Sequence, residues 1–303
     1  MSRSSIVRAL SCVLLIVVLA GVAQPAAAQS RSAIYIMDAD GSNIVKASHT
    51  DDMWLGSAAW SHDGKKLLYG GLPADDFTRI RLYLQVLGEE QATDLGTGDA
   101  PCWSPDDSQI VFCQSVRNAF GARPGVWVMN FDGRGREWIS EGRRPRWSPD
   151  GEKLAFVSDH EGFESVYVME LSAVELTRVR VLDRGYDQII GASWSPDSQQ
   201  LVFVGYKGGR ASQSLQADLA VVEANANQKP KVLHHGHVGW HPDWSPNGKQ
   251  VVFWIRDGNK ERLHLLELDS DKPPRLLPGQ FTQRNSDPVW SPDGKKIAFS
   301  SDR

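Results

Sequence analysis

Trp290-Ser291-Pro292-Asp293-Gly294 is one of six near-identical five-residue phrases that recur along this chain of 303 residues. The other copies begin at Trp60, Trp103, Trp147, Trp194 and Trp244, and successive tryptophans are separated by 43 to 50 residues. A near-constant period of that size is typical of repeat proteins, in which each repeat is one unit of a larger ring or array. The phrase therefore predicts a repeat architecture. Because six copies share it, the phrase marks scaffold, and functional residues are expected where the repeats differ.

The third repeat indicates how one unit folds. Residues 145–148 form a short expected strand, and Ser148-Pro149-Asp150-Gly151 has the residue types that a tight turn requires. A second strand is expected over 153–157, which is apolar enough to be buried on both faces. Third and fourth strands are expected over 165–170 and 176–182. Four consecutive antiparallel strands make a propeller blade, so the predicted fold class is all-β, a six-bladed β-propeller of four-stranded antiparallel blades.

The two ends of the chain supply complementary halves of one blade. The last repeat stops at Arg303, directly after its expected second strand at 296–299. Residues 33–38 have the pattern of a third strand, and residues 43–48 follow as an outer strand. We therefore expect the N-terminal strands to pair with the C-terminal repeat, which closes the ring and leaves no open sheet edge between blades.

Some positions depart from the repeat. Asp107 and Ser198 stand where glycine is preferred at the end of the turn. Serine tolerates a left-handed backbone less well than aspartate, so we expect a locally different turn near Ser198, at a cost of about 1 kcal/mol. Cys102 and Cys113 lie in one expected hairpin. We expect two buried free thiols, with a disulfide as the alternative.

The first residues have the features of a secretory signal peptide. Arg3 and Arg8 are followed by an apolar run to residue 22, and Pro25-Ala26-Ala27-Ala28 offers a small-residue cleavage site. We expect residues 1–28 to be a signal peptide, residues 29–303 to be a single β-propeller domain, and the mature protein to be periplasmic or secreted with no membrane span. The net charge is −4 and there is no basic block, which argues against nucleic acid as a partner.

Trp290 to Arg303, continued by Ile34-Tyr35-Ile36-Met37-Asp38-Ala39-Asp40-Gly41, resembles the repeat of TolB-like propellers. That repeat runs from a Trp-Ser-Pro-Asp-Gly turn through an Ile-Ala-Phe strand to Ser-Asp-Arg, and then through an Ile-Tyr-Val-Met strand to Asp-Gly. The resemblance implies a periplasmic propeller related to the Tol system, whose name-giving member holds a partner lipoprotein. We expect this chain to lack the α/β domain that precedes the propeller in that member.

The loops that lead into the innermost strand of each blade lie just before the repeat tryptophans, and they are rich in charged and aromatic residues. Binding residues concentrate on loops that a rigid scaffold positions. We therefore expect a ligand at the mouth of the central channel. The candidate ligand-binding residues are Arg144, Arg146, Trp240, His241 and Asp287.

The densest group of histidines is His234, His235, His237 and His241. His234 and His235 are neighbours on an expected outer strand, so their side chains point to opposite faces. The spacing matches no known zinc motif. We predict no metal site and no cofactor, with a transition metal at this cluster as the alternative.

The sequence contains no nucleophile elbow, zinc-protease motif or phosphate-binding loop, so no catalytic residue is assigned. We expect a monomeric binding or scaffolding module of the cell envelope, whose partner is an envelope protein, a peptide or a glycan at the channel mouth. The alternative is a carbohydrate-active propeller enzyme, a lyase or hydrolase of acidic sugars. In that case Arg143, Arg144 and Arg146 would neutralise uronate carboxylates, with His241 near the chemistry.

Overall fold

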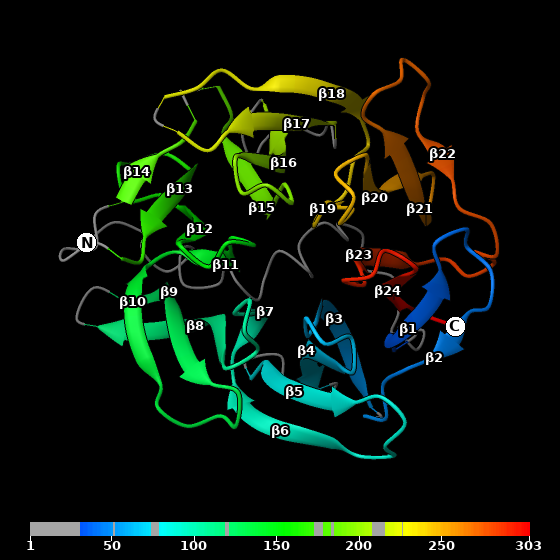
Figure 1. The fold of residues 1–303 in the computed structure, drawn as a ribbon, viewed down its shortest axis with the longest axis horizontal. Helices are drawn as coiled ribbons and strands as arrows, with labels where there is room; N and C mark the ends of the chain where they lie inside the picture. Colours follow the sequence, from blue (N-terminus) through cyan, green and yellow to red (C-terminus); the bar gives the residue numbers. More distant parts are fainter. Residues whose placement is uncertain are drawn as a thin grey trace.

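The computed structural model describes residues 31–50, 52–73, 79–118, 121–172, 178–182, 185–207, 216–225 and 227–303. Within these ranges the chain forms six four-stranded antiparallel sheets around a central axis (Figure 1). The protein is therefore an all-β, six-bladed propeller, as predicted. The expected signal peptide, residues 1–28, lies outside the described residues. In the described ranges there is no helix that is both long enough and apolar enough to cross a membrane.

Each blade places its first strand near the axis and its fourth strand at the rim (Figure 1). Blade 1 contains β3 (Met53–Trp60), β4 (Lys66–Pro73), β5 (Arg81–Val86) and β6 (Ala92–Thr97); blade 2 contains β7 (Asp99–Trp103), β8 (Gln109–Asn118), β9 (Gly121–Asn130) and β10 (Glu137–Glu141). Blade 3 contains β11 (Arg143–Trp147), β12 (Lys153–Ser158), β13 (Ser165–Glu170) and β14 (Arg178–Arg180); blade 4 contains β15 (Gln188–Trp194), β16 (Gln200–Tyr206), β17 (Ala217–Glu223) and β18 (Lys231–Gly236). Blade 5 contains β19 (Asp243–Trp244), β20 (Gln250–Asp257), β21 (Lys260–Glu267) and β22 (Arg275–Leu276). The expected strands of blade 3 are confirmed; of the expected rim strand at 176–182, residues 176–177 lie outside the described residues and β14 covers Arg178–Arg180.

Blade 6 is shared between the two ends of the chain. Its strand order is β23 (Asn285–Trp290), β24 (Lys296–Ser301), β1 (Ala33–Asp38) and β2 (Val45–Lys46). β1 pairs with β24 along its whole length, from Ala33 opposite Ser301 to Asp38 opposite Lys296. Ile34 and Met37 of β1 are fully buried. The predicted closure of the ring is therefore confirmed, with two strands from each end.

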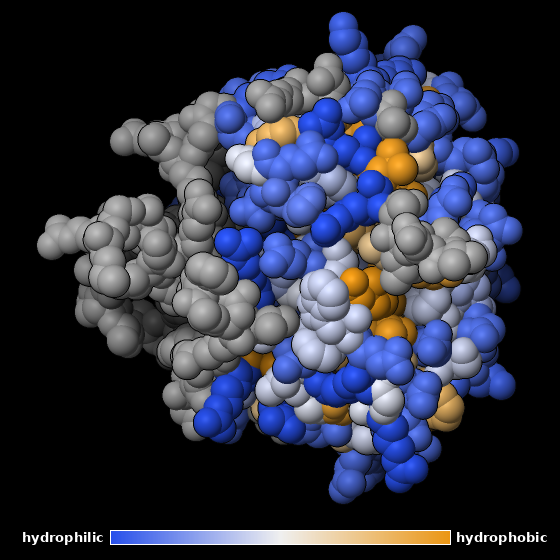
Figure 2. All heavy atoms as spheres, turned by 90° about the vertical axis from the view of Figure 1, so that its left-hand side faces the viewer, coloured by the Kyte–Doolittle hydropathy of each residue, from blue (hydrophilic) through white to orange (hydrophobic). Residues whose placement is uncertain are grey.

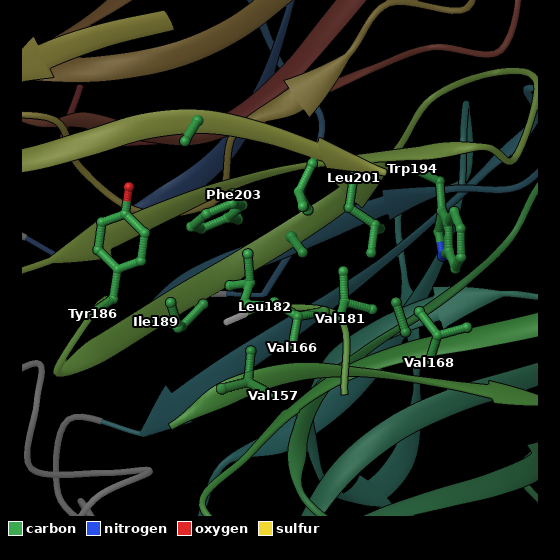
Figure 3. Close-up of a cluster of buried hydrophobic side chains, with 14 residues drawn as sticks. Val157, Val166, Val168, Val181, Leu182, Tyr186, Ile189, Trp194, Leu201 and Phe203 are labelled. Atoms are coloured by element: carbon green, nitrogen blue, oxygen red, sulfur yellow. The ribbon is translucent and has the colours of Figure 1, made fainter. Parts of the chain in front are cut away.

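The core consists of apolar layers between neighbouring blades. Figure 3 shows the layer between blades 3 and 4, in which Val157, Val166 and Val168 face Ile189, Trp194, Leu201 and Phe203. The second strand of each blade holds an aromatic side chain at the same position. Each of these six side chains is at most 1% exposed: Tyr69, Phe112, Phe156, Phe203, Phe253 and Phe299. On the side shown in Figure 2, hydrophilic residues cover most of the described surface and hydrophobic ones occupy small areas.

The repeat phrase forms the same turn in every blade. The serine hydroxyl donates to the carboxylate or amide oxygen two residues later, at 2.5–2.8 Å in all six copies. The expectation of a different turn at Ser198 is wrong, because Ser198 adopts φ 59° and its N–H donates to the Ser195 carbonyl at 2.9 Å, as in the glycine-containing turns. Ser198 Oγ also accepts the N–H of Asp150 in the preceding blade at 3.1 Å. This contact stabilises the left-handed serine.

Both cysteines of the described chain are free thiols, with Cys113 buried and Cys102 partly exposed. Cys102 lies on β7 opposite Val111, and Cys113 lies on β8 opposite Asp99. The expectation of free thiols is confirmed, but only Cys113 is buried as expected. Desolvation raises the pKa of the Cys102 thiol.

Candidate functional site

Each blade carries a backbone irregularity three residues before its repeat tryptophan. The residue at this position is left-handed in all six blades, with φ between 50° and 69°. We call these residues the mouth ring: Ser57, Ala100, Arg144, Gly191, His241 and Asp287. In five blades the pairing register shifts across the same position. Five members are not glycine, although a left-handed backbone costs other residues roughly 1–2 kcal/mol. Such strain is concentrated at functional sites in proteins.

Two further rings follow along the innermost strands. The inner ring is the residue directly before each tryptophan: Ala59, Cys102, Arg146, Ser193, Asp243 and Val289. The turn ring consists of the residues two positions after each repeat tryptophan: His62, Pro105, Pro149, Pro196, Pro246 and Pro292. A central cavity of about 310 Å³ is lined by every member of the inner and turn rings. Ser57, His241 and Asp287 of the mouth ring also line it. The turn ring is nearly uniform, whereas the other two rings differ from blade to blade.

His241 and Asp287 join blade 5 to blade 6 within the mouth ring. His241 Nδ1 lies 2.9 Å from Asp287 Oδ1, and the two side chains are 9% and 16% exposed. An ionised carboxylate can only accept, so Nδ1 carries the proton and Nε2 is an acceptor when the imidazole is neutral. Burial lowers the pKa of His241, and the positive charges of Arg144 and Arg146 lower it further. The Asp287 carboxylate acts in the opposite direction but does not cancel the shift. At neutral pH the imidazole is therefore neutral.

Asp287 remains ionised in this buried position. Burial alone would raise its pKa, but His241 and Arg144 outweigh burial and the pKa is lowered below its ordinary value. Asp287 Oδ2 also accepts the backbone N–H of Ser57 from blade 1, at 3.4 Å. The carboxylate thus connects three blades at the channel mouth.

Arg144 and Trp240 lie beside this pair rather than in the cavity lining. The Arg144 guanidinium is 5.8 Å from the centroid of the Trp240 ring, a distance at which a cation and an aromatic face attract each other. Trp240 also packs edge-on against Trp254 of β20, with ring centroids 6.4 Å apart. Of the five candidate residues, the structure thus places Arg144, His241 and Asp287 in the mouth ring, Arg146 in the inner ring, and Trp240 against Arg144.

The inner ring contains a partly buried carboxylate, Asp243, that the candidate set omitted. Asp243 accepts a hydrogen bond from Ser193 Oγ at 2.7 Å and another from the Trp290 N–H at 2.8 Å. Burial raises the pKa of Asp243 to about 6, although both hydrogen bonds and Arg146 oppose the shift. Asp243 could have been found from the sequence, because it stands directly before the repeat tryptophan Trp244. Arg146 and Ser193 stand directly before the tryptophans of their own repeats.

The face with the channel mouth also presents an aromatic side chain that sequence reasoning missed. Phe281, between β22 and β23, is 90% exposed. Its neighbours are anchored: Gln280 bonds to the N–H and carbonyl of Leu263, and the Thr282 carbonyl accepts a hydrogen bond from Arg262. The anchored loop therefore holds an exposed aromatic side chain at a fixed place on this face.

The four histidines of the sequence cluster do not converge. His235 Nδ1 lies 2.7 Å from Asp218 Oδ1, whereas the His234 ring packs against Phe253 with centroids 6.0 Å apart. His241 belongs to the channel. In the described part of the chain no group of three or more His, Cys, Asp or Glu side chains is arranged to hold a metal ion.

Comparison with known proteins identifies the class of this propeller. The family model described as TolB beta propeller domain matches residues 17–188 and 177–303, so the chain belongs to the TolB β-propeller family. A protein of Agrobacterium fabrum is 27% identical over 261 residues, which are 79% of this chain and 82% of its own length. The Tol-Pal system protein TolB of Francisella tularensis is 23% identical over 243 residues, 78% of this chain. The chain spans only 54% of that relative.

Two solved structures share the fold. A putative TolB from Agrobacterium tumefaciens has a TM-score of 0.68 and 22% identity, covering 89% of this chain and 98% of its own. TolB from Acinetobacter baumannii has a TM-score of 0.62 and 20% identity, covering 97% of this chain and 68% of its own. At these identities the likeness supports the propeller fold alone.

Proposed function

We propose that this protein is an exported binding module of the cell envelope, which holds a segment of an envelope protein at the mouth of its central channel. Arg144, Arg146, Trp240, His241 and Asp287 would make the contacts. Membership of the TolB β-propeller family and similarity to a Tol-Pal system protein support a place in the envelope.

One observation carries the proposal. The mouth ring uses one backbone position in six blades, yet it holds arginine, histidine and aspartate where glycine would cost least. The turn ring, built on the same strands, holds proline in five blades. Left-handed polar residues at one end of the channel and nearly uniform residues at the other end support a binding site at the mouth. The exposed Phe281 on the same face adds an apolar contact for a folded partner.

The carbohydrate-active alternative has no comparable observation in its favour, and we do not propose it.

The experiment compares capture of envelope proteins by the wild-type protein and by two mouth-ring variants, Arg144→Gln and Asp287→Asn. The expected result is loss of one specific captured protein with both variants, because each removes a charge at the mouth. The matched controls are Arg81→Gln and Asp94→Asn, which remove the partners of an ion pair on blade 1.

Melting of each variant separates binding from folding. If the mouth variants retain the wild-type melting temperature and still capture the same protein as the controls do, the proposed site is wrong. If they capture nothing and also unfold at ambient temperature, milder Arg144→Lys and Asp287→Glu variants repeat the comparison.

A further inference from the structure

Arg146 and Asp243 line the same cavity, and both are partly buried there. Both belong to the inner ring, Arg146 on blade 3 and Asp243 on blade 5. Arg146 Nη1 donates to the carbonyls of Pro145 and Ala100, at 3.0 and 3.5 Å. Asp243 accepts only neutral donors, Ser193 Oγ and the Trp290 N–H. Among the described residues neither side chain makes a direct ion pair, although Arg146 is near enough to oppose the rise in the pKa of Asp243.

Unpaired charges inside a protein are costly unless a ligand or a partner neutralises them. Here the two charges have opposite signs and stand on different walls of one cavity, separated by blade 4, which contributes Ser193. The cavity therefore offers one cationic and one anionic position to whatever fills it. Blades 1 and 2 contribute only small or uncharged inner-ring residues, Ala59 and Cys102, which leave room between the charged walls.

His241 adds a buried acceptor to the lining of the same cavity. Its Nδ1 is occupied by Asp287, and its Cδ2 faces Gly191, where a Cβ would lie only 3.0 Å away. Its buried Nε2 has no hydrogen-bond partner. Because Nδ1 carries the proton, Nε2 presents a lone pair. A ligand N–H group between His241 Nε2 and Asp243 would satisfy both.

We propose that the central cavity binds a small zwitterion, an α-amino acid, with its carboxylate against Arg146 and its ammonium group between Asp243 and His241. A volume of about 310 Å³ is at the lower end of the range for small-ligand pockets, which suits a molecule of this size. The inference shares Arg146 and His241 with the proposed mouth site, but its binding test uses the protein alone and does not require a protein partner.

The test measures binding of individual α-amino acids to the full mature protein by calorimetry. For the amino acid that binds best, two analogues follow: its amide, which lacks the carboxylate, and its N-acetyl derivative, which lacks the ammonium group. Each analogue should bind about tenfold or more weakly, because a site built for a polar group rejects the ligand that lacks it. No binding by any amino acid, or equal binding of the analogues, overturns the proposal.

Two variants assign the two ends of the ligand. Arg146→Gln should abolish the preference for the acid over the amide, and Asp243→Asn should abolish the preference for the free ammonium over the N-acetyl form. Arg81→Gln and Asp94→Asn, on the rim of blade 1, should retain both preferences. Retention of both preferences in the cavity variants contradicts the assignment, as does binding of dipeptides or zinc without binding of amino acids. If a cavity variant does not fold, the analogue series on the wild-type protein still decides the proposal.

Discussion

His241 of blade 5 donates from Nδ1 to Oδ1 of Asp287 in blade 6, at 2.9 Å. Both residues stand at the same position of their repeats, three before the tryptophan, and both have a left-handed backbone, with φ 55° and 52°. The repeat scaffold therefore brings two dissimilar side chains into contact by placing them at equivalent points of neighbouring blades. Their contact fixes the imidazole and leaves its other nitrogen, Nε2, buried without a hydrogen-bond partner among the described residues.

His241 should titrate below its ordinary value of 6.5. Burial and the two nearby arginines disfavour the imidazolium, so as pH falls through 6.5 the unfolded chain takes up a proton that the folded protein does not. Stability is then lost as pH falls. Imidazole signals assigned by NMR with His241→Gln measure the pKa directly. A His241 pKa at or above 6.5 contradicts this description of the site.

Asp243 should give a pH dependence of opposite sign. Its pKa is raised from 3.8 to about 6 by burial, so the folded state disfavours the ionised form. The wild-type protein should therefore lose stability relative to Asp243→Asn as pH rises from about 4 to about 7. Urea denaturation of both proteins across this range measures the difference. A difference that grows in favour of the wild type with rising pH would show that Asp243 is stabilised as a carboxylate.

The strain of the mouth ring can be measured at its two smallest members. Ala100→Gly should leave stability unchanged or raise it by up to about 1 kcal/mol, because glycine adopts φ 50° without strain. Gly191→Ala should lower it by more than about 1 kcal/mol, because the added Cβ is strained at φ 69° and meets His241 Cδ2 at 3.0 Å. Chemical denaturation of both variants gives the comparison. Equal effects would mean that the mouth ring carries no strain.

Most of the fold follows from the sequence, because the turn residues of the repeat and the apolar strand after it are local features. The third repeat is enough to place its strands, and 33–38 is recognisable as a strand without its neighbours. Ser198 shows the limit of local reasoning, since its left-handed turn is stabilised by Asp150 from another repeat.

The candidate site is only partly predictable for a related reason. Arg144, His241 and Asp287 stand out as charged residues beside the repeat tryptophans, but their meeting depends on the closure of the ring. Asp243 is as close to its tryptophan as Arg146 is, yet its unpaired state in the cavity depends on neighbouring blades. Trp240 is conspicuous in the sequence, but its place is clear only from the structure. It packs against Trp254 and lies beside the Arg144 guanidinium, outside the cavity lining.

The closure of the ring predicts a contrast between two residues of the same N-terminal segment. Ile34→Ala should lower the free energy of unfolding by about 2–5 kcal/mol, because Ile34 is fully buried in β1. Val45→Ala in β2 should change it by less than about 0.5 kcal/mol, because Val45 is 58% exposed. Denaturation of the two variants tests this contrast. If Ile34→Ala is as stable as Val45→Ala, the N-terminal strands do not hold the ring together.

Photo-crosslinking in the native envelope tests the proposed binding face most directly. A photoreactive phenylalanine replaces Gln283, which is exposed on the loop leading to Asp287 at the mouth, or Lys295, whose side chain is 80% exposed in the turn at the opposite end of blade 6. The expected result is one crosslinked envelope protein from position 283 and none from position 295. Crosslinks from position 295 alone, or equal crosslinks from both positions, would contradict binding at the channel mouth.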